Sequence, residues 1–137
     1  MKITVLKELA TGDTRVPVVP PGVQKLVELG AEVEVESTLG STIGVSDEDY
    51  REVGAVVAAD RSACNKTADL VLCLNQPPVD EVALCKSGAI LIGLLDPFNQ
   101  RPLLEKAAAA SVSSLAMEMI PRTTLAQKMD ALSSQAN

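Results

Sequence analysis

Apolar residues in this chain gather in short runs, and the pattern within each run predicts its secondary structure. Continuous or partly β-branched apolar runs predict strands over residues 3–6, 55–58, 69–74, 89–95 and 112–117, with 55–58 at an edge. Residues 31–36 alternate between apolar side chains and glutamate, which predicts a strand whose polar face is solvated. That face carries Glu32, Glu34 and Glu36, and we expect no metal there because no opposing ligands are in view.

Helices are predicted between the strands, where apolar residues recur at helical spacing or good helix formers accumulate. They cover residues 21–29, 46–53, 79–86 and 101–110, with a helix or turn over 62–66 and a last helix from about residue 125. Ser46 and Asp49 stand at capping-box spacing, and Gly30 and Gly54 are stop signals. Strands and helices that alternate every 20–30 residues or so predict an α/β fold, a doubly wound, flavodoxin- or Rossmann-like parallel sheet in three layers.

Composition narrows the class of function. With 137 residues, 47% of them apolar, the chain can form one domain with an aliphatic core, because Tyr50 and Phe98 are its only aromatic residues. A net charge of −6 and the lack of aromatic side chains argue against nucleic-acid binding. The absence of histidine removes the commonest general acid–base and the commonest metal ligand.

Three cysteines, Cys64, Cys73 and Cys85, form no paired motif. We expect them to be reduced thiols, at least two of them buried, in a reducing compartment. The longest apolar run, residues 89–95, is far shorter than the ~20 residues of a membrane helix, so we expect a soluble intracellular chain that does not insert into a bilayer.

Polar side chains concentrate after the last predicted strand, at Arg122, Gln127, Asp130 and Ser133. In open parallel sheets ligands bind beyond the carboxyl ends of the strands, so this segment is a candidate site. Residue types alone also allow a simpler interpretation, in which Pro121 and the threonines end a strand and cap a helix with a solvated face.

The stretch PRTTLAQKMDALSSQAN resembles the loop Pro-Arg-x-x-x-Ala-Gln-x-Met-Asp-x-Leu-Ser-Ser of the NAD(H)-binding α subunit of proton-translocating NAD(P)+ transhydrogenase. Residues 91–97 and 117–137 resemble transhydrogenase specifically, and residues 6–30 resemble a signature shared with alanine dehydrogenase. The resemblance makes residues 1–137 an alanine dehydrogenase/transhydrogenase-type amino-terminal lobe. It implies that Arg122, Gln127, Asp130 and Ser133 surround the nicotinamide end of NAD(H). Leu125 departs from the arginine usual in the family.

The same resemblance implies direct hydride transfer from NADH to NADP+ coupled to proton movement. NADP(H) would bind to a partner subunit, a further subunit would span the membrane, and this lobe would pair as a homodimer on the cytoplasmic face, peripheral to the membrane. The family's NAD-binding domain, with its Gly-x-Gly-x-x-Gly turn, is absent from this chain, so we expect the 137-residue chain to be inactive alone.

Two alternatives remain at this point. One is an alanine-dehydrogenase-like lobe, whose substrate site has an arginine, a lysine and a histidine. Arg15 matches the arginine, but the other two positions fall at Cys73 and Leu94, which disfavours that chemistry. Arg15 then forms either an ion pair with Glu8 or Asp13, which we prefer, or an anion contact near the cleft. The other alternative is a stand-alone, non-catalytic binding domain.

Overall fold

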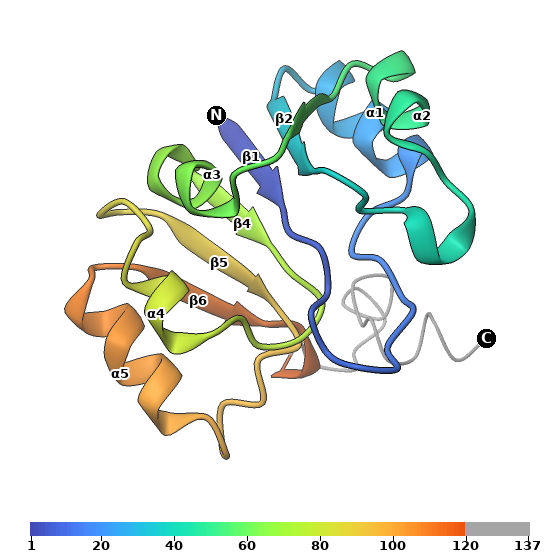
Figure 1. The fold of residues 1–137 in the computed structure, drawn as a ribbon. Coiled ribbons are helices and arrows are strands. Elements are labelled where there is room, and N and C mark those ends of the chain that lie inside the picture. The colour runs from blue at the N-terminus through green and yellow to red at the C-terminus, as the bar shows by residue number, and fades with distance from the viewer. Residues whose placement is uncertain (120–137) are drawn as a thin grey trace, which may run out of the picture.

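The computed structural model describes residues 1–119, which form a six-stranded parallel sheet with helices on both faces (Figure 1). Along the sheet the strands follow the order β3-β2-β1-β4-β5-β6, so the short strand β3 is an edge as predicted. This arrangement confirms the doubly wound α/β fold. The strands are β1 (Lys2–Val5), β2 (Glu32–Glu36), β3 (Val56–Ala58), β4 (Leu70–Leu72), β5 (Ile90–Gly93) and β6 (Ser113–Ala116).

Five α-helices and two 3₁₀ turns connect these strands. They are α1 (Pro20–Glu28), α2 (Asp47–Glu52), α3 (Arg61–Thr67), α4 (Val79–Val82), α5 (Arg101–Ala109), η1 (Ser41–Ile43) and η2 (Met117–Met119). Within residues 1–119 the longest helices have nine residues, and none is able to cross a bilayer.

Local hydrogen bonds explain where two of these helices agree with or differ from the sequence-based prediction. The predicted capping box of α2 is present, because Ser46 Oγ accepts from the Asp49 N–H and the Asp49 carboxylate accepts from the Ser46 N–H. Helix α4 is shorter than predicted. After Val82 the backbone continues with bonds between residues three apart, from the N–H groups of Leu84 and Cys85, so the helix tightens into a turn.

The two faces of the sheet have separate cores. On one face α1 and α2 cover β1 and β2, and Val23 and Tyr50 pack against Val5 and Val35. On the other face α4 and α5 cover β4 and β5, where Leu103 packs in a cluster with neighbouring aliphatic and thiol side chains. Helix α3 lies on that second face against β1. Helices on both faces give the three predicted layers (Figure 1).

The predicted solvated face of β2 is wrong for two of its three glutamates. Glu32 is exposed, but the side chains of Glu34 and Glu36 are only 17% and 14% exposed. Glu36 accepts from the Lys7 N–H at 2.6 Å and from the Arg61 guanidinium at 2.9 Å. Alternation identified which side chains share a face, but it could not show that α3 covers that face and supplies a cation.

Candidate functional site

The strand order reverses between β1 and β4, and this reversal sets the position of the candidate site. Loops that leave neighbouring strands in opposite directions open a crevice at the carboxyl ends of those strands, where open α/β sheets bind ligands. Here the crevice lies between the loop after β1, residues 6–19, and the loop after β4, residues 73–78.

An apolar pocket of about 260 Å³ occupies this crevice. Pro17 and Val18 line it from the first loop, Cys73 from the end of β4, Leu94 from the end of β5, and Met117 from η2. None of its lining side chains is charged. Pockets for whole drug-sized ligands span about 300–1,000 Å³, so this one suits a single ring system rather than an entire dinucleotide.

The floor of the pocket depends on a close approach of β4 and β5. A Cβ atom at Gly93 would lie 2.6 Å from Cys73 Sγ and 2.8 Å from the Cys73 carbonyl oxygen, so a larger residue would push the strands apart. The thiol of Cys73 donates to the Ile92 carbonyl at 3.3 Å. Burial raises the pKa of Cys73 to about 12, so this thiol stays neutral and is a poor nucleophile at neutral pH.

A polar cluster lies at the end of β1 and the end of β4. Arg15 donates to both carboxylate oxygens of Asp13, at 3.1 and 2.8 Å, which confirms the predicted ion pair. These hydrogen bonds hold the pKa of the Asp13 carboxyl well below its usual range, and Asn75 adds a further bond to the same carboxylate at 2.8 Å. Asp13 is therefore an anion at any physiological pH, not a proton carrier.

The cluster also corrects one position assigned by resemblance. Asn75 is the side chain that shares Asp13 with Arg15, whereas Cys73 turns into the pocket. A lysine that acted together with Arg15 would therefore stand at residue 75 rather than 73. Neither position is a lysine in this chain.

Glu8 connects the two loops across the reversal point. One of its oxygens accepts from the N–H groups of Leu9 and Ala10, both at 2.9 Å, and the other accepts from the Asn75 N–H at 2.9 Å. The opposite wall is fixed by Tyr50, whose buried hydroxyl donates to the Val18 carbonyl at 2.8 Å. The crevice is thus held by hydrogen bonds on both sides. Among residues 1–119, no group of three or more His, Cys, Asp or Glu side chains is placed to hold a metal ion.

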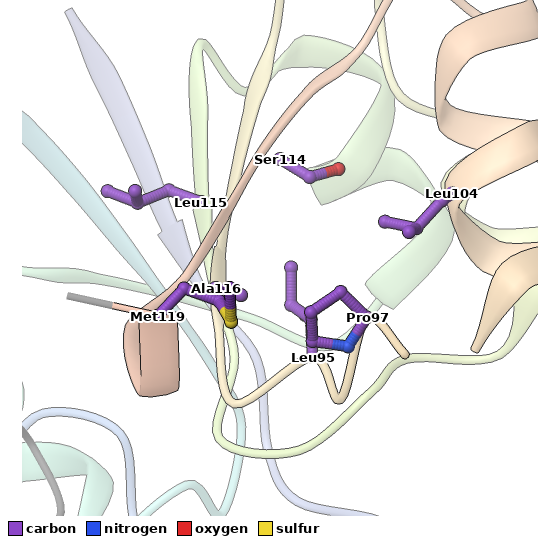
Figure 2. Close-up of a pocket in the computed structure, with 7 residues that line it drawn as sticks. All are labelled: Leu95, Pro97, Leu104, Ser114, Leu115, Ala116 and Met119. Carbon is purple, nitrogen blue, oxygen red and sulfur yellow. The ribbon is translucent and has the colours of Figure 1, made fainter. Parts of the chain in front are cut away.

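A second cavity, of about 380 Å³, lies between α5 and the edge strand β6 (Figure 2). Leu104 of α5 faces Ser114 and Ala116 of β6 across it, with Pro97 and Met119 nearby (Figure 2). Its lining has one hydroxyl and no charged group. We place the candidate site in the crevice instead, because the crevice lies at the strand reversal and beside the charged cluster.

The predicted ligand residues Arg122, Gln127, Asp130 and Ser133 lie outside the described residues, so their roles remain predictions. The structure does show where the preceding residues lead. Met117 lines the crevice, and the Glu118 carboxylate accepts hydrogen bonds from the end of β5. Sequence reasoning missed Glu118, although it is the one charged residue between Val112 and Ile120 and that isolation was a usable signal.

Comparison with known proteins gives a consistent result. Residues 4–137 match the model of the family described as alanine dehydrogenase/PNT, N-terminal domain. The chain is 39% identical over its whole length to an NAD(P) transhydrogenase subunit alpha protein of Rhodospirillum rubrum, and it spans 37% of that relative. It is 30% identical to alanine dehydrogenase 1 of Staphylococcus aureus, over 99% of this chain and 36% of that one.

The fold is equally close to a solved structure. A structure of transhydrogenase from Sinorhizobium meliloti superposes with a TM-score of 0.93 at 36% identity, over 99% of this chain and 40% of that one. The chain therefore spans about two fifths or less of the length of the relatives it matches.

Proposed function

The chain belongs to the alanine dehydrogenase/PNT N-terminal domain family, and on that premise we propose that it is the amino-terminal lobe of the NAD(H)-binding α subunit of a proton-translocating transhydrogenase. In this proposal hydride passes directly from NADH on this subunit to NADP+ on a partner subunit, coupled to proton movement. The observation that carries the choice between the two branches of the family is the aliphatic crevice, with Cys73 and Leu94 in its lining.

Direct hydride transfer suits such a crevice. Transfer between two nicotinamide rings needs no general acid, base or metal from the protein, which must orient the rings and exclude water. The crevice offers apolar walls, an inert thiol and a carboxylate already paired with a guanidinium. Alanine dehydrogenase chemistry, in contrast, needs a proton carrier beside the carbonyl, and the sequence contains no histidine.

The residues present fit one end of a dinucleotide. The pocket is large enough for a ring and too small for the rest of the molecule. We propose that Gln127 and Asp130 orient the dihydronicotinamide, and that Arg122 and Ser133 hold its amide or a nearby phosphate. NADH supplies the hydride, and the chain supplies binding, orientation and exclusion of water.

The proposal extends to the assembly. We propose that the lobe works as a homodimer at the cytoplasmic face of a membrane, peripheral to it, together with a membrane subunit and an NADP(H)-binding subunit. The relatives named as subunit alpha support a multi-subunit complex.

Reconstituted transhydrogenation tests this function. The complete gene product, combined with its partner subunits, is expected to reduce an NADP+ analogue of shifted absorbance with NADH as the donor. Asp130→Asn is expected to lower that rate by about tenfold or more through misplacement of the ring. Glu105→Gln is the control, because Glu105 is exposed on α5 and pairs only with Arg101. NADH oxidation that requires pyruvate and ammonium, with no transfer to the analogue, would instead support the alanine dehydrogenase branch.

A further inference from the structure

Glu118 lies where the pairing of β5 and β6 ends. The last paired residues are Gly93 and Ala116, and the next N–H group, that of Leu94, donates to Leu74 on the opposite side at 2.7 Å. The N–H of Leu95 then points back toward β6, where Glu118 Oε1 accepts it at 3.0 Å. A side-chain carboxylate thus takes the place of the backbone carbonyl that a longer β6 would have supplied.

The end of β5 is a built acceptor for this carboxylate. Leu95 is fully buried, so its N–H needs a partner. Asp96 has a φ of 48°, in the left-handed region, and its N–H donates to Glu118 Oε2 at 3.2 Å. The Asp96 carbonyl in turn accepts from the N–H groups of Asn99 and Gln100, at 3.1 and 3.0 Å. Two successive backbone donors on a fixed turn make a small anion cradle, and Glu118 fills it.

This anchor stands between the crevice and the candidate nucleotide ligands. Met117 lines the crevice and Met119 lines the cavity beside β6, so the pinned Glu118 lies between two side chains that enter different cavities. Arg122 follows four residues later, and four residues of extended chain reach at most about 14 Å. The anchor therefore limits where Arg122 can lie relative to the crevice.

We infer that Glu118 is a positioning residue for the nicotinamide site. Its carboxylate holds the chain at the carboxyl end of β5, so that the segment with Arg122, Gln127, Asp130 and Ser133 starts at the rim of the crevice. This role rests on the proposed function, because it presumes that these four residues contact NAD(H). A purely structural role, in which Glu118 only stabilises the sheet end, predicts a loss of stability without a change in the affinity of the folded protein.

The test measures NADH affinity and the anchor separately in the complete gene product. Glu118→Ala removes both acceptor oxygens, and Glu118→Gln keeps one. Glu105→Ala, on the same side of the sheet but exposed, is the matched control. NADH is titrated at a temperature where all variants are folded, and the amide resonances of Leu95 and Asp96 report the anchor without any nucleotide.

We expect the Kd for NADH to rise about tenfold or more in Glu118→Ala, less in Glu118→Gln and not at all in Glu105→Ala. The Leu95 and Asp96 amides should shift in both Glu118 variants. If the wild type binds NADH and Glu118→Ala binds it equally well although those amides shift, the positioning role is wrong and the proposed function stands. If the wild type does not bind NADH, the proposed function fails and the positioning role fails with it, whatever the amides show.

Discussion

Arg61 is the side chain whose removal should cost the fold most outside the apolar core. Its guanidinium donates to the Lys7 carbonyl at 2.8 Å and to Glu36 at 2.9 Å, and it also binds Glu81. The three side chains are only 14–18% exposed. The second oxygen of Glu81 is buried without a hydrogen-bond partner. Arg61 is therefore the cation that makes two poorly solvated carboxylates tolerable.

We predict that Arg61→Met lowers the free energy of unfolding by about 3 kcal/mol, the low end of the range for breaking a buried ion pair. Methionine keeps most of the packing of the arginine stem, so the loss reports mainly the two unpaired carboxylates. For a chain of this length that loss corresponds to a fall in Tm of roughly 10 °C. The triple variant Arg61→Met, Glu36→Gln, Glu81→Gln should recover most of it, because it removes the stranded charges.

Urea denaturation followed by far-UV circular dichroism measures these changes, since the chain has no tryptophan. Arg51→Met is the matched control. Arg51 is exposed and pairs with Glu48 at 3.2 Å, so its removal should cost less than about 0.5 kcal/mol. A loss below 1 kcal/mol for Arg61→Met, or a triple variant no more stable than the single one, would show that the cluster behaves like a surface ion pair and would refute this reasoning.

Three further predictions use groups away from that cluster. The cysteines should not react with a disulfide reagent at pH 8 until the protein is unfolded, because all three are buried and burial raises the pKa of each thiol, to about 12 for Cys73; fast labelling of the native chain would contradict this. The ion pair of Asp13 with Arg15 lowers the pKa of Asp13, so its contribution to stability should persist above the ordinary value of 3.8 and disappear as the pH falls below that value; Asp13→Asn should flatten the acid limb of stability against pH. Thr4→Val should leave the free energy of unfolding unchanged or raise it by up to ~1 kcal/mol, because the buried hydroxyl of Thr4 has no partner; a loss above 1 kcal/mol would be the contrary result.

The order of strands and helices could be predicted because each element is short and has a clear pattern. Continuous apolar runs marked β4 and β5, and the capping pair Ser46 and Asp49 marked α2. Helix α3 was predicted only as a helix or turn. Its Asp60 cap, which accepts from the Ala63 N–H, gives it a defined start that the apolar pattern of residues 62–66 does not reveal.

What sequence reasoning missed are interactions between distant residues. Glu36 and Arg61 are 25 positions apart, Glu8 and Asn75 are 67 apart, and Glu118 and Leu95 are 23 apart. In each case a side chain satisfies a group on another strand or loop, which depends on the order of strands in the sheet. The Arg15–Asp13 pair could be predicted because its members are two residues apart.

The most direct test of the central claim follows the hydrogen atom itself. NADH deuterated at the transferred position on C4 is supplied, with NADP+, to the complete gene product and its partner subunits, and the isotope is located by mass spectrometry. Direct transfer between nicotinamide rings predicts deuterium in NADPH at the level of the donor, with no dilution by solvent hydrogen. Deuterium found in alanine when pyruvate and ammonium are present, and absent from NADPH, would contradict the account.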